Sequence, residues 1–151
     1  MHRQLATPDT PAFGVGADDL TRQHRTVRIE VSELRAMIDS CRATQRTDGY
    51  RQMLAVLVCR LRERLVLHFE LEQDGAHAAR IRASFPAAAG DLARFADEHD
   101  RLLSEAAALA MQLRTPDAPP DVEARTMRWL DALRQHEQAE ELFLAQLEER
   151  P

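Results

Sequence analysis

Residues 54–72 read LAVLVCRLRERLVLHFELE, and the spacing of their apolar side chains decides the fold class. One stripe runs through this stretch at intervals of three and four residues: Leu54, Val58, Leu61, Leu65, His68 and Glu72. Such intervals place side chains on one face of an α-helix, which predicts a helix that buries this face. A buried polar group costs about 2 kcal/mol or more unless it has a partner, so the histidine and the glutamate must be satisfied within the core.

Three other segments of the chain carry stripes with the same spacing. The first contains Leu20, His24, Val27, Val31, Leu34, Ile38 and Cys41. Another contains Leu92, Phe95, His99, Leu102, Ala106, Leu109 and Leu113. The last contains Val122, Thr126, Trp129, Leu133, His136, Glu140, Phe143 and Leu147. Together the four stripes predict four amphipathic helices of about 25 residues each.

Turn-forming residues separate the stripes. The breaks are TQRTDG at 44–49, a longer connection at 74–90 that includes Phe85-Pro86, and RTPDAPPD at 114–121. No segment alternates in the way a strand does. Because short connections make successive helices antiparallel neighbours, we predict an all-α protein, an up-down-up-down antiparallel four-helix bundle.

Length and composition agree with one soluble domain. The chain has 151 residues and is 44% hydrophobic, which suits a single core. We assign residues 17–151 to the bundle and residues 1–16, which contain two prolines and two glycines, to an N-terminal arm.

Charge and hydropathy bear on the partners of the chain. The net charge of -5 argues against nucleic acid, because binding to the phosphate backbone needs a positive surface. No apolar run approaches the roughly 20 residues of a membrane span, and no apolar leader is recognisable, so we expect a cytoplasmic protein with no membrane partner. All 20 basic residues are arginine, which is typical of a GC-rich bacterial genome.

Each stripe contains one histidine, and the four histidines are expected at one level of the bundle. Two residues equidistant from a turn lie at the same height in an antiparallel hairpin. The midpoint of His24 and His68 falls at residue 46, that of His68 and His99 between 83 and 84, and that of His99 and His136 between 117 and 118. All three midpoints lie inside the predicted breaks, so the four imidazoles converge on one layer near one end.

Two of these histidines bring a carboxylate. His68 and Glu72, like His136 and Glu140, are four residues apart, which is about 40° of rotation around a helix. Their helices, second and fourth in the bundle, should lie on a diagonal, so that the two glutamates meet at the centre. Two bridging carboxylates and two imidazoles would then serve each of two metal ions. Positions remain for a bridging oxygen (oxo or hydroxo) and a small ligand, and ligands without thiolate favour Fe, Mn or Zn.

A layer of histidine and glutamate without metal is the alternative interpretation. A single histidine in a helical stripe is usually structural, and a single His-x-x-x-Glu is common on solvated helices. Four stripes, one level and two such pairs are difficult to obtain by chance. A metal-free layer would also leave two carboxylates poorly compensated, so we expect a metal site.

These stretches resemble the hemerythrin-like, HHE cation-binding domain family over about residues 17–150. The matching stretches are TRQHRTV around His24, HFELE at 68–72, DEHDRLL at 97–103 and HEQAEELF at 136–143. The resemblance implies a four-helix bundle with a non-haem di-iron centre. It gives the ligand roles to His24, His68, Glu72, His99, His136 and Glu140, with the two glutamates as bridges.

The chain departs from the oxygen-carrying hemerythrins at two positions. Those carriers place a second histidine one turn before the one matched by His99, where this chain has Phe95. They also space the last carboxylate five residues from its histidine, which here would be Glu141. That position lies about 140° from His136 on the helix, whereas Glu140 lies on the stripe, so we favour Glu140. The ligand set is more similar to bacterial and ubiquitin-ligase-type members, which argues against reversible oxygen carriage.

Residues around the layer carry weaker expectations. The aromatic rings that could shield it from water, with ordinary core packing as the alternative role, are Phe69, Phe95 and Phe143. The flanking carboxylates are Glu70, Glu98, Glu137 and Glu141. We expect most of them to be solvated, although they could accept hydrogen bonds from the imidazole N–H groups. His77 and His2 miss the layer and are expected on the surface.

The leading functional hypothesis is a di-iron protein that binds or reacts with dioxygen, nitric oxide or peroxide, for sensing, scavenging or storage. A sensor would need a protein partner. The alternatives are a peroxide-decomposing or oxidase enzyme at the same centre, and a zinc-binding or metal-free helical module that binds a partner helix. Nothing in the sequence supplies a substrate pocket or a dedicated acid or base beyond the ligands.

Overall fold

A computed structural model describes residues 14–44 and 49–149 of the chain. The long helices are α1 (Gly14–Thr44), α2 (Tyr50–Asp74), α4 (Ala89–Arg114) and α5 (Val122–Glu148). Between α2 and α4 lie the short helix α3 (Ala76–Ser84) and the 3-10 turn η1 (Pro86–Ala88). The described residues contain no strand, which confirms the prediction of an all-α protein.

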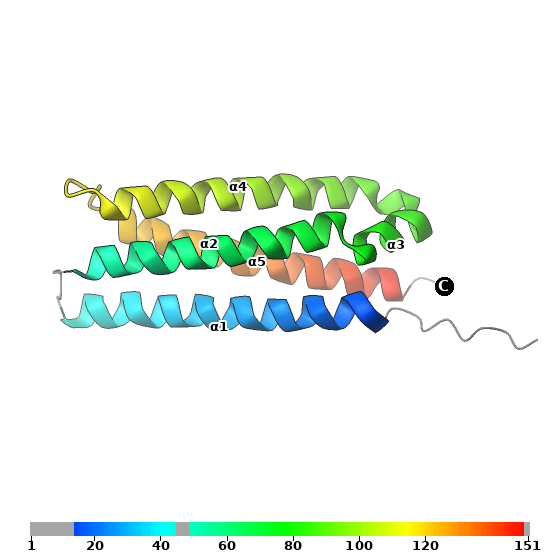
Figure 1. Cartoon of the computed structure of the whole chain (residues 1–151), viewed down its shortest axis with the longest axis horizontal. Coiled ribbons are helices and arrows are strands. Elements are labelled where there is room, and N and C mark those ends of the chain that lie inside the picture. The colour runs from blue at the N-terminus through cyan, green and yellow to red at the C-terminus, as the bar shows by residue number, and fades with distance from the viewer. Residues whose placement is uncertain (1–13, 45–48, 150–151) are drawn as a thin grey trace, which may run out of the picture.

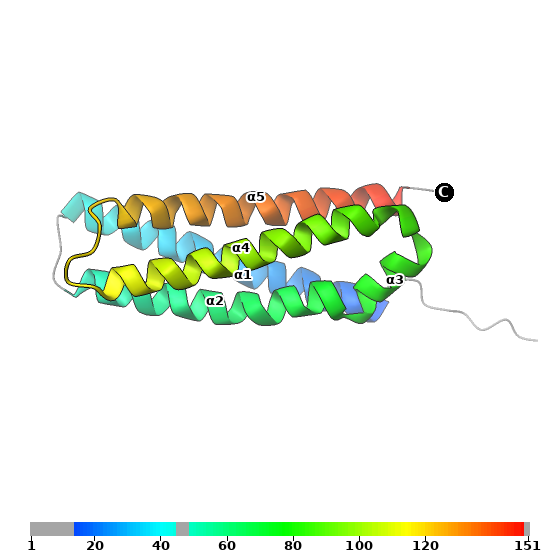
Figure 2. The ribbon, with the colours of Figure 1, turned by 90° about the horizontal axis from the view of Figure 1, so that it is seen from above.

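The four long helices form an antiparallel up-down-up-down bundle (Figure 1). α1 packs against α2 and α5, and α4 packs against the same two helices. The pairs α1/α4 and α2/α5 therefore lie on the diagonals, which the view from above also shows (Figure 2). The diagonal placement of the two helices with His-x-x-x-Glu pairs is the one that the sequence predicted.

The connection at 74–90 differs from its expected form, because most of it is helical. Gly75 separates α2 from α3: its N–H donates to the carbonyl oxygen of Leu71, and a Cβ at this position would collide with that oxygen. α3 then buries only Ala78 and Ile81. α3 and η1 lie at the end of the bundle where α1 starts and α5 ends (Figure 1).

The other chain boundaries agree with the predicted breaks. Gly49 takes the left-handed conformation, with φ of 72°, directly before α2, and residues 45–48 of the first break lie outside the described residues. α1 begins at Gly14, so the last three residues of the expected arm are helical, and residues 1–13 lie outside the description.

The core is built from the predicted stripes. Its largest side chain, Trp129, is fully buried, and its indole N–H donates to the carbonyl oxygen of Leu102 at 3.0 Å. The apolar cluster extends along α1, α2, α4 and α5 as far as Phe69. Across residues 14–44 and 49–149, none of the helices has the length and hydropathy needed to cross a membrane.

Candidate metal centre

The four predicted histidines meet in one layer at the α3 end of the bundle. Their exposed fractions are 6% for His24, 1% for His68, 1% for His99 and 4% for His136. Four different helices supply them, so no single helix determines the layer. With two glutamates they form two groups, within each of which the potential ligand atoms lie within 4.8 Å of one another: His24, His68 and Glu72, and His99, His136 and Glu140.

In each group the Nε2 atoms of the histidines face one carboxylate oxygen. Oε1 of Glu72 lies 2.8 Å from Nε2 of His24 and 3.0 Å from Nε2 of His68. Oε1 of Glu140 lies 3.0 Å from Nε2 of His99 and 3.2 Å from Nε2 of His136.

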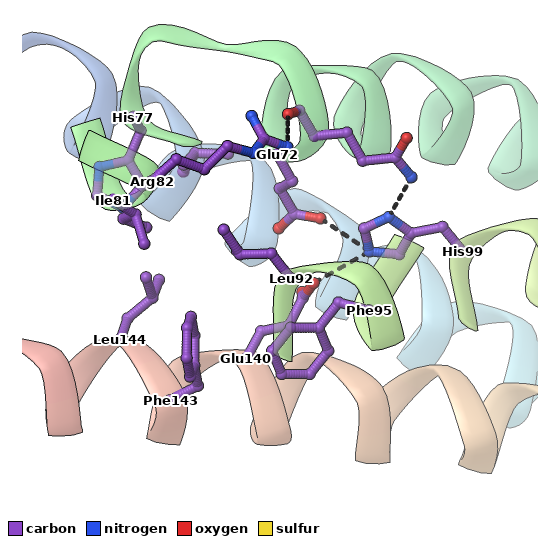
Figure 3. Close-up of a pocket in the computed structure, with 12 residues that line it drawn as sticks. Glu72, His77, Ile81, Arg82, Leu92, Phe95, His99, Glu140, Phe143 and Leu144 are labelled. Carbon is purple, nitrogen blue, oxygen red and sulfur yellow. Dashed lines mark hydrogen bonds and ion pairs between the residues drawn. The ribbon is translucent and has the colours of Figure 1, made fainter. Parts of the chain in front are cut away.

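Glu72 also connects the two groups. Its second oxygen, Oε2, lies 3.4 Å from Nε2 of His99. Figure 3 shows Glu72 and Glu140 reaching His99 from two sides. Glu140 contacts only histidines of its own group in the described residues, so the two glutamates are not equivalent.

The other ring nitrogens face outward. Nδ1 of His68 donates to Oε1 of Gln23 at 2.9 Å, and Nδ1 of His136 donates to Oε2 of Glu98 at 2.7 Å. Partners on Nδ1 fix the orientation of the ring and leave Nε2 available to a metal.

The other two histidines follow the same arrangement less strictly. The side-chain amide of Gln73 donates to Nδ1 of His99 at 2.8 Å, and a half-turn of this amide would present its oxygen to the ring instead. Nδ1 of His24 lies 4.0 Å from Oε1 of Glu141. All four rings thus turn Nε2 toward Glu72 or Glu140 and Nδ1 away from these two residues.

Unpartnered atoms of the layer support a metal site. Four of its buried polar atoms have no hydrogen-bond partner among the described residues: Oε2 of Glu72, Oε2 of Glu140, Nε2 of His68 and Nε2 of His136. Unsatisfied buried polar groups are rare and costly, and carboxylates need compensation most. A divalent cation in each group would satisfy these atoms, and imidazole with carboxylate suits Fe, Mn or Zn.

The histidines and glutamates shift one another's pKa values. Burial alone would raise the pKa of Glu72, but the hydrogen bond with His24 and the adjacent imidazole of His68 lower it well below its ordinary value. Burial would lower the pKa of His24 and of His136, but the neighbouring carboxylates more than offset it and raise both. Burial raises the pKa of Glu137 to about 7.

These pKa shifts predict how the stability of the metal-free fold changes with pH. The raised pKa values of His24, His136 and Glu137 stabilise the metal-free fold in acid, and this contribution is lost as the pH rises through the folded values, near 7 for Glu137. The lowered pKa of Glu72 adds stability above its ordinary value of 4.5 that is lost as the pH falls. The metal-free thermal midpoint should therefore decrease from about pH 6 to about pH 8.

Bound metal should reverse the direction in which the thermal midpoint changes with pH. Metal ligation needs deprotonated imidazoles, so the thermal midpoint of the loaded protein should increase over the same interval. Calorimetry of both forms at several pH values measures the two slopes. Parallel slopes would show that the buried histidines do not bind the added metal.

Aromatic rings surround the layer, as expected. Phe69 is buried and stacks on His99 with ring centroids 3.8 Å apart. Phe95 makes an edge contact with His136, with ring centroids 5.7 Å apart. Phe143 packs against Phe95, with ring centroids 5.5 Å apart. These rings cover the layer on the sides of α2, α4 and α5.

A small cavity lies beside the two groups. Its volume is about 40 Å³, and its lining includes Glu72, His99 and Glu140 together with Phe95 and Phe143 (Figure 3). One water molecule needs about 10–15 Å³, so a diatomic molecule or peroxide fits within this volume.

The glutamates near the layer differ in how exposed they are and in what they contact. Glu140 is buried inside its group, whereas the side chain of Glu141 is 44% exposed and bound to Arg28, which supports the choice of Glu140. Glu98 accepts a hydrogen bond from a layer histidine as expected, and Glu70 is exposed. Residue spacing carries no signal for Gln23 and Gln73, which bind imidazoles from positions next to His24 and Glu72.

Two further residues are more buried than their sequence positions suggest. Glu137 is 1% exposed, its Oε1 has no hydrogen-bond partner among the described residues, and its Oε2 lies 3.8 Å from Nε of Arg28. The expected surface position of His77 is wrong, because this residue is half-buried in α3 and both its ring nitrogens are enclosed. His2 lies outside the described residues.

The comparison with known families agrees with this geometry. The model of the family described as "Hemerythrin HHE cation binding domain" matches residues 15–147. Comparisons with curated proteins and with solved structures gave no match.

Proposed function

Because this chain belongs to the hemerythrin HHE cation-binding domain family, we propose that it holds two non-haem iron ions that bind or react with a small ligand. His24, His68 and Glu72 would hold one ion, and His99, His136 and Glu140 would hold the other. Manganese and zinc suit the same ligands and are the alternatives for the metal.

The observation that supports this proposal most is the direction of the four imidazoles. Each turns Nε2 toward the carboxylate of Glu72 or Glu140, and Glu72 contacts histidines of both groups. The chain therefore orients its nitrogen and oxygen atoms before any metal arrives, which lowers the cost of binding.

Iron bound here would supply Lewis acidity and an electron for the binding or reduction of dioxygen, nitric oxide or peroxide. The chain limits access to this chemistry by size and polarity. Phe95 and Phe143 line the cavity beside Glu72, His99 and Glu140, so apolar rings exclude bulk water from one side of the layer. Because Phe95 stands where oxygen carriers have a histidine, we propose sensing, scavenging or storage rather than carriage.

Iron content and optical spectra test this function. Protein loaded anaerobically with ferrous iron and desalted should retain about two iron ions per chain, one for each group. After oxidation, the ferric absorption should change when azide is added, because azide would occupy the open position. Retention of less than one iron, or a preference for zinc with no response to azide, would contradict the proposal and favour a helical module without redox chemistry.

Peroxide then distinguishes the binding role from an enzymatic one. The iron-loaded protein is mixed with hydrogen peroxide, and an oxygen electrode follows the release of dioxygen. Starting from the diferrous form, we expect a single equivalent of peroxide to be consumed, because two ferrous ions supply the two electrons that reduce one peroxide to water. The described residues place no acid or base in the cavity beyond the candidate ligands and His77 to support further turnovers. Sustained release over many turnovers would instead identify a peroxide-decomposing enzyme.

A further inference from the structure

α2 exposes a row of large apolar side chains in addition to the stripe that it buries. The described residues expose seven large apolar side chains, and four of them belong to α2: Met53, Val56, Leu67 and Leu71. Because each residue advances a helix by about 100°, these four lie within about 60° of one another around the axis. Single apolar residues on a surface are ordinary, but a row on one side of a helix indicates an interaction site.

The position of α2 leaves this row uncovered by the rest of the described chain. α2 packs against α1 and α4. Figure 2 shows α2 along the edge of the bundle opposite α5, so its outer side faces away from the core. Leu67, the most exposed member of the row, is 64% accessible although it directly precedes the buried His68.

Two charged side chains lie on the same side of α2, between the apolar ends of the row. Arg60 and Glu63 are exposed, and neither forms an ion pair with another described residue. The nearby Arg64 is already bound to Glu30 of α1, with NH2 2.8 Å from Oε1. The outer face of α2 therefore consists of an apolar pair at each end and one positive and one negative charge in the middle.

This outer face is complementary to itself when two copies of α2 are antiparallel. The midpoint of Val56 and Leu67 falls between residues 61 and 62, and so does the midpoint of Arg60 and Glu63. The midpoint of Met53 and Leu71 is residue 62. A two-fold axis at this point thus places apolar residues opposite apolar residues and each arginine opposite a glutamate of the other copy.

Other arrangements do not use this pattern. Two parallel copies of α2 would place Arg60 opposite Arg60 and Glu63 opposite Glu63, and facing like charges are unfavourable. A partner of another sequence would not require the apolar and the charged residues to share a midpoint. The shared midpoint therefore favours a second copy of this chain as the occupant of the outer face.

We propose that two copies of the chain associate through the outer faces of their α2 helices, antiparallel around a two-fold axis beside residues 61 and 62. Val56 of each copy packs against Leu67 of the other, and two ion pairs between Arg60 and Glu63 lie between these contacts. None of these side chains is a candidate metal ligand, so the association does not depend on bound metal.

Sedimentation equilibrium of the full-length chain over a series of concentrations tests this interface. The wild type should have twice the mass of one chain. Leu67→Glu removes an apolar contact at two places in the dimer and should raise the dissociation constant about 100-fold. The matched control is Met111→Glu, the same kind of change at a position of α4 that is 66% exposed, and it should leave the dissociation constant unchanged. Circular dichroism checks that each variant is folded.

Exchange of the two charges tests the antiparallel arrangement. Arg60→Glu and Glu63→Arg each place like charges opposite one another at two places, so each should raise the dissociation constant about tenfold. The double variant with both substitutions restores opposite charges and should return the dissociation constant to the wild-type value. In a parallel dimer neither single substitution would change the sign of the facing charges.

Three outcomes would refute the proposal. A wild-type chain that stays monomeric throughout the series would show that the outer face of α2 does not bind a second copy. A dimer that Leu67→Glu leaves unchanged would show that the copies meet through another surface. A double charge variant that dimerises no better than the single variants would show that Arg60 and Glu63 do not face each other across the axis.

Discussion

Glu72→Gln should abolish the binding of both metal ions, whereas Glu140→Gln should remove only one of them. Glu72 contacts His24, His68 and His99, so it serves both groups, and Glu140 contacts histidines of one group. The amide preserves the volume of the side chain but removes its negative charge, which a cation between neutral imidazoles needs.

Mass spectrometry of metal in desalted protein measures this difference. Wild type should hold about two iron ions per chain, Glu140→Gln about one and Glu72→Gln close to none. Glu141→Gln is the matched control: it changes the next residue of α5, whose exposed carboxylate binds Arg28, and it should keep both ions. Loss of an ion from Glu141→Gln, with both retained in Glu140→Gln, would move the last ligand role to Glu141.

Metal should also raise the thermal midpoint by roughly 20 °C. A ligand at a thousand times its dissociation constant stabilises a fold by about 4 kcal/mol per site, and two sites give about 8 kcal/mol. For a domain of this size, 1 kcal/mol moves the midpoint by about 2–4 °C. The effect should be large because binding also satisfies the unpartnered oxygens of Glu72 and Glu140.

Anaerobic calorimetry with and without ferrous iron checks this shift. Glu72→Gln serves as the control, since a chain that binds no metal should melt at the same temperature in both conditions. A shift in wild type below about 3 °C would show that the layer is stable without metal and that its carboxylates are compensated in another way.

The bundle and its layer could be predicted because both follow from simple periodicity. Stripes at three- and four-residue intervals determine which faces are buried, and a turn determines which residues of two antiparallel helices share a height. Four histidines with midpoints inside three breaks therefore had to meet. The choice of Glu140 over Glu141 followed from rotation around one helix alone, and the burial of Glu140 supports it.

Other features of the site depend on tertiary contacts that spacing does not encode. α3 has the sequence AHAARIRAS, with one large apolar residue, so the burial of its side chains depends on the helices that pack around it rather than on its own pattern. The sequence alone places His77 on the surface for this reason. Glu137 lies off the stripe, yet it is buried beside Arg28, a residue of a different helix.

The difference between Glu72, which contacts histidines of both groups, and Glu140, which contacts one group, also depends on tertiary contacts. Both occupy the same position relative to the histidine four residues before them, and only the packing of α2 against α4 brings Oε2 of Glu72 within 3.4 Å of Nε2 of His99. Gln23 and Gln73 likewise reach imidazoles of neighbouring helices, and no spacing rule marks a glutamine for this role.

Anomalous scattering at the iron absorption edge, from crystals of the iron-loaded protein, tests the central claim most directly. We predict two peaks in one layer, one among His24, His68 and Glu72 and one among His99, His136 and Glu140, with the carboxylate of Glu72 between them. A single peak, or peaks away from these six side chains, would contradict the di-iron centre.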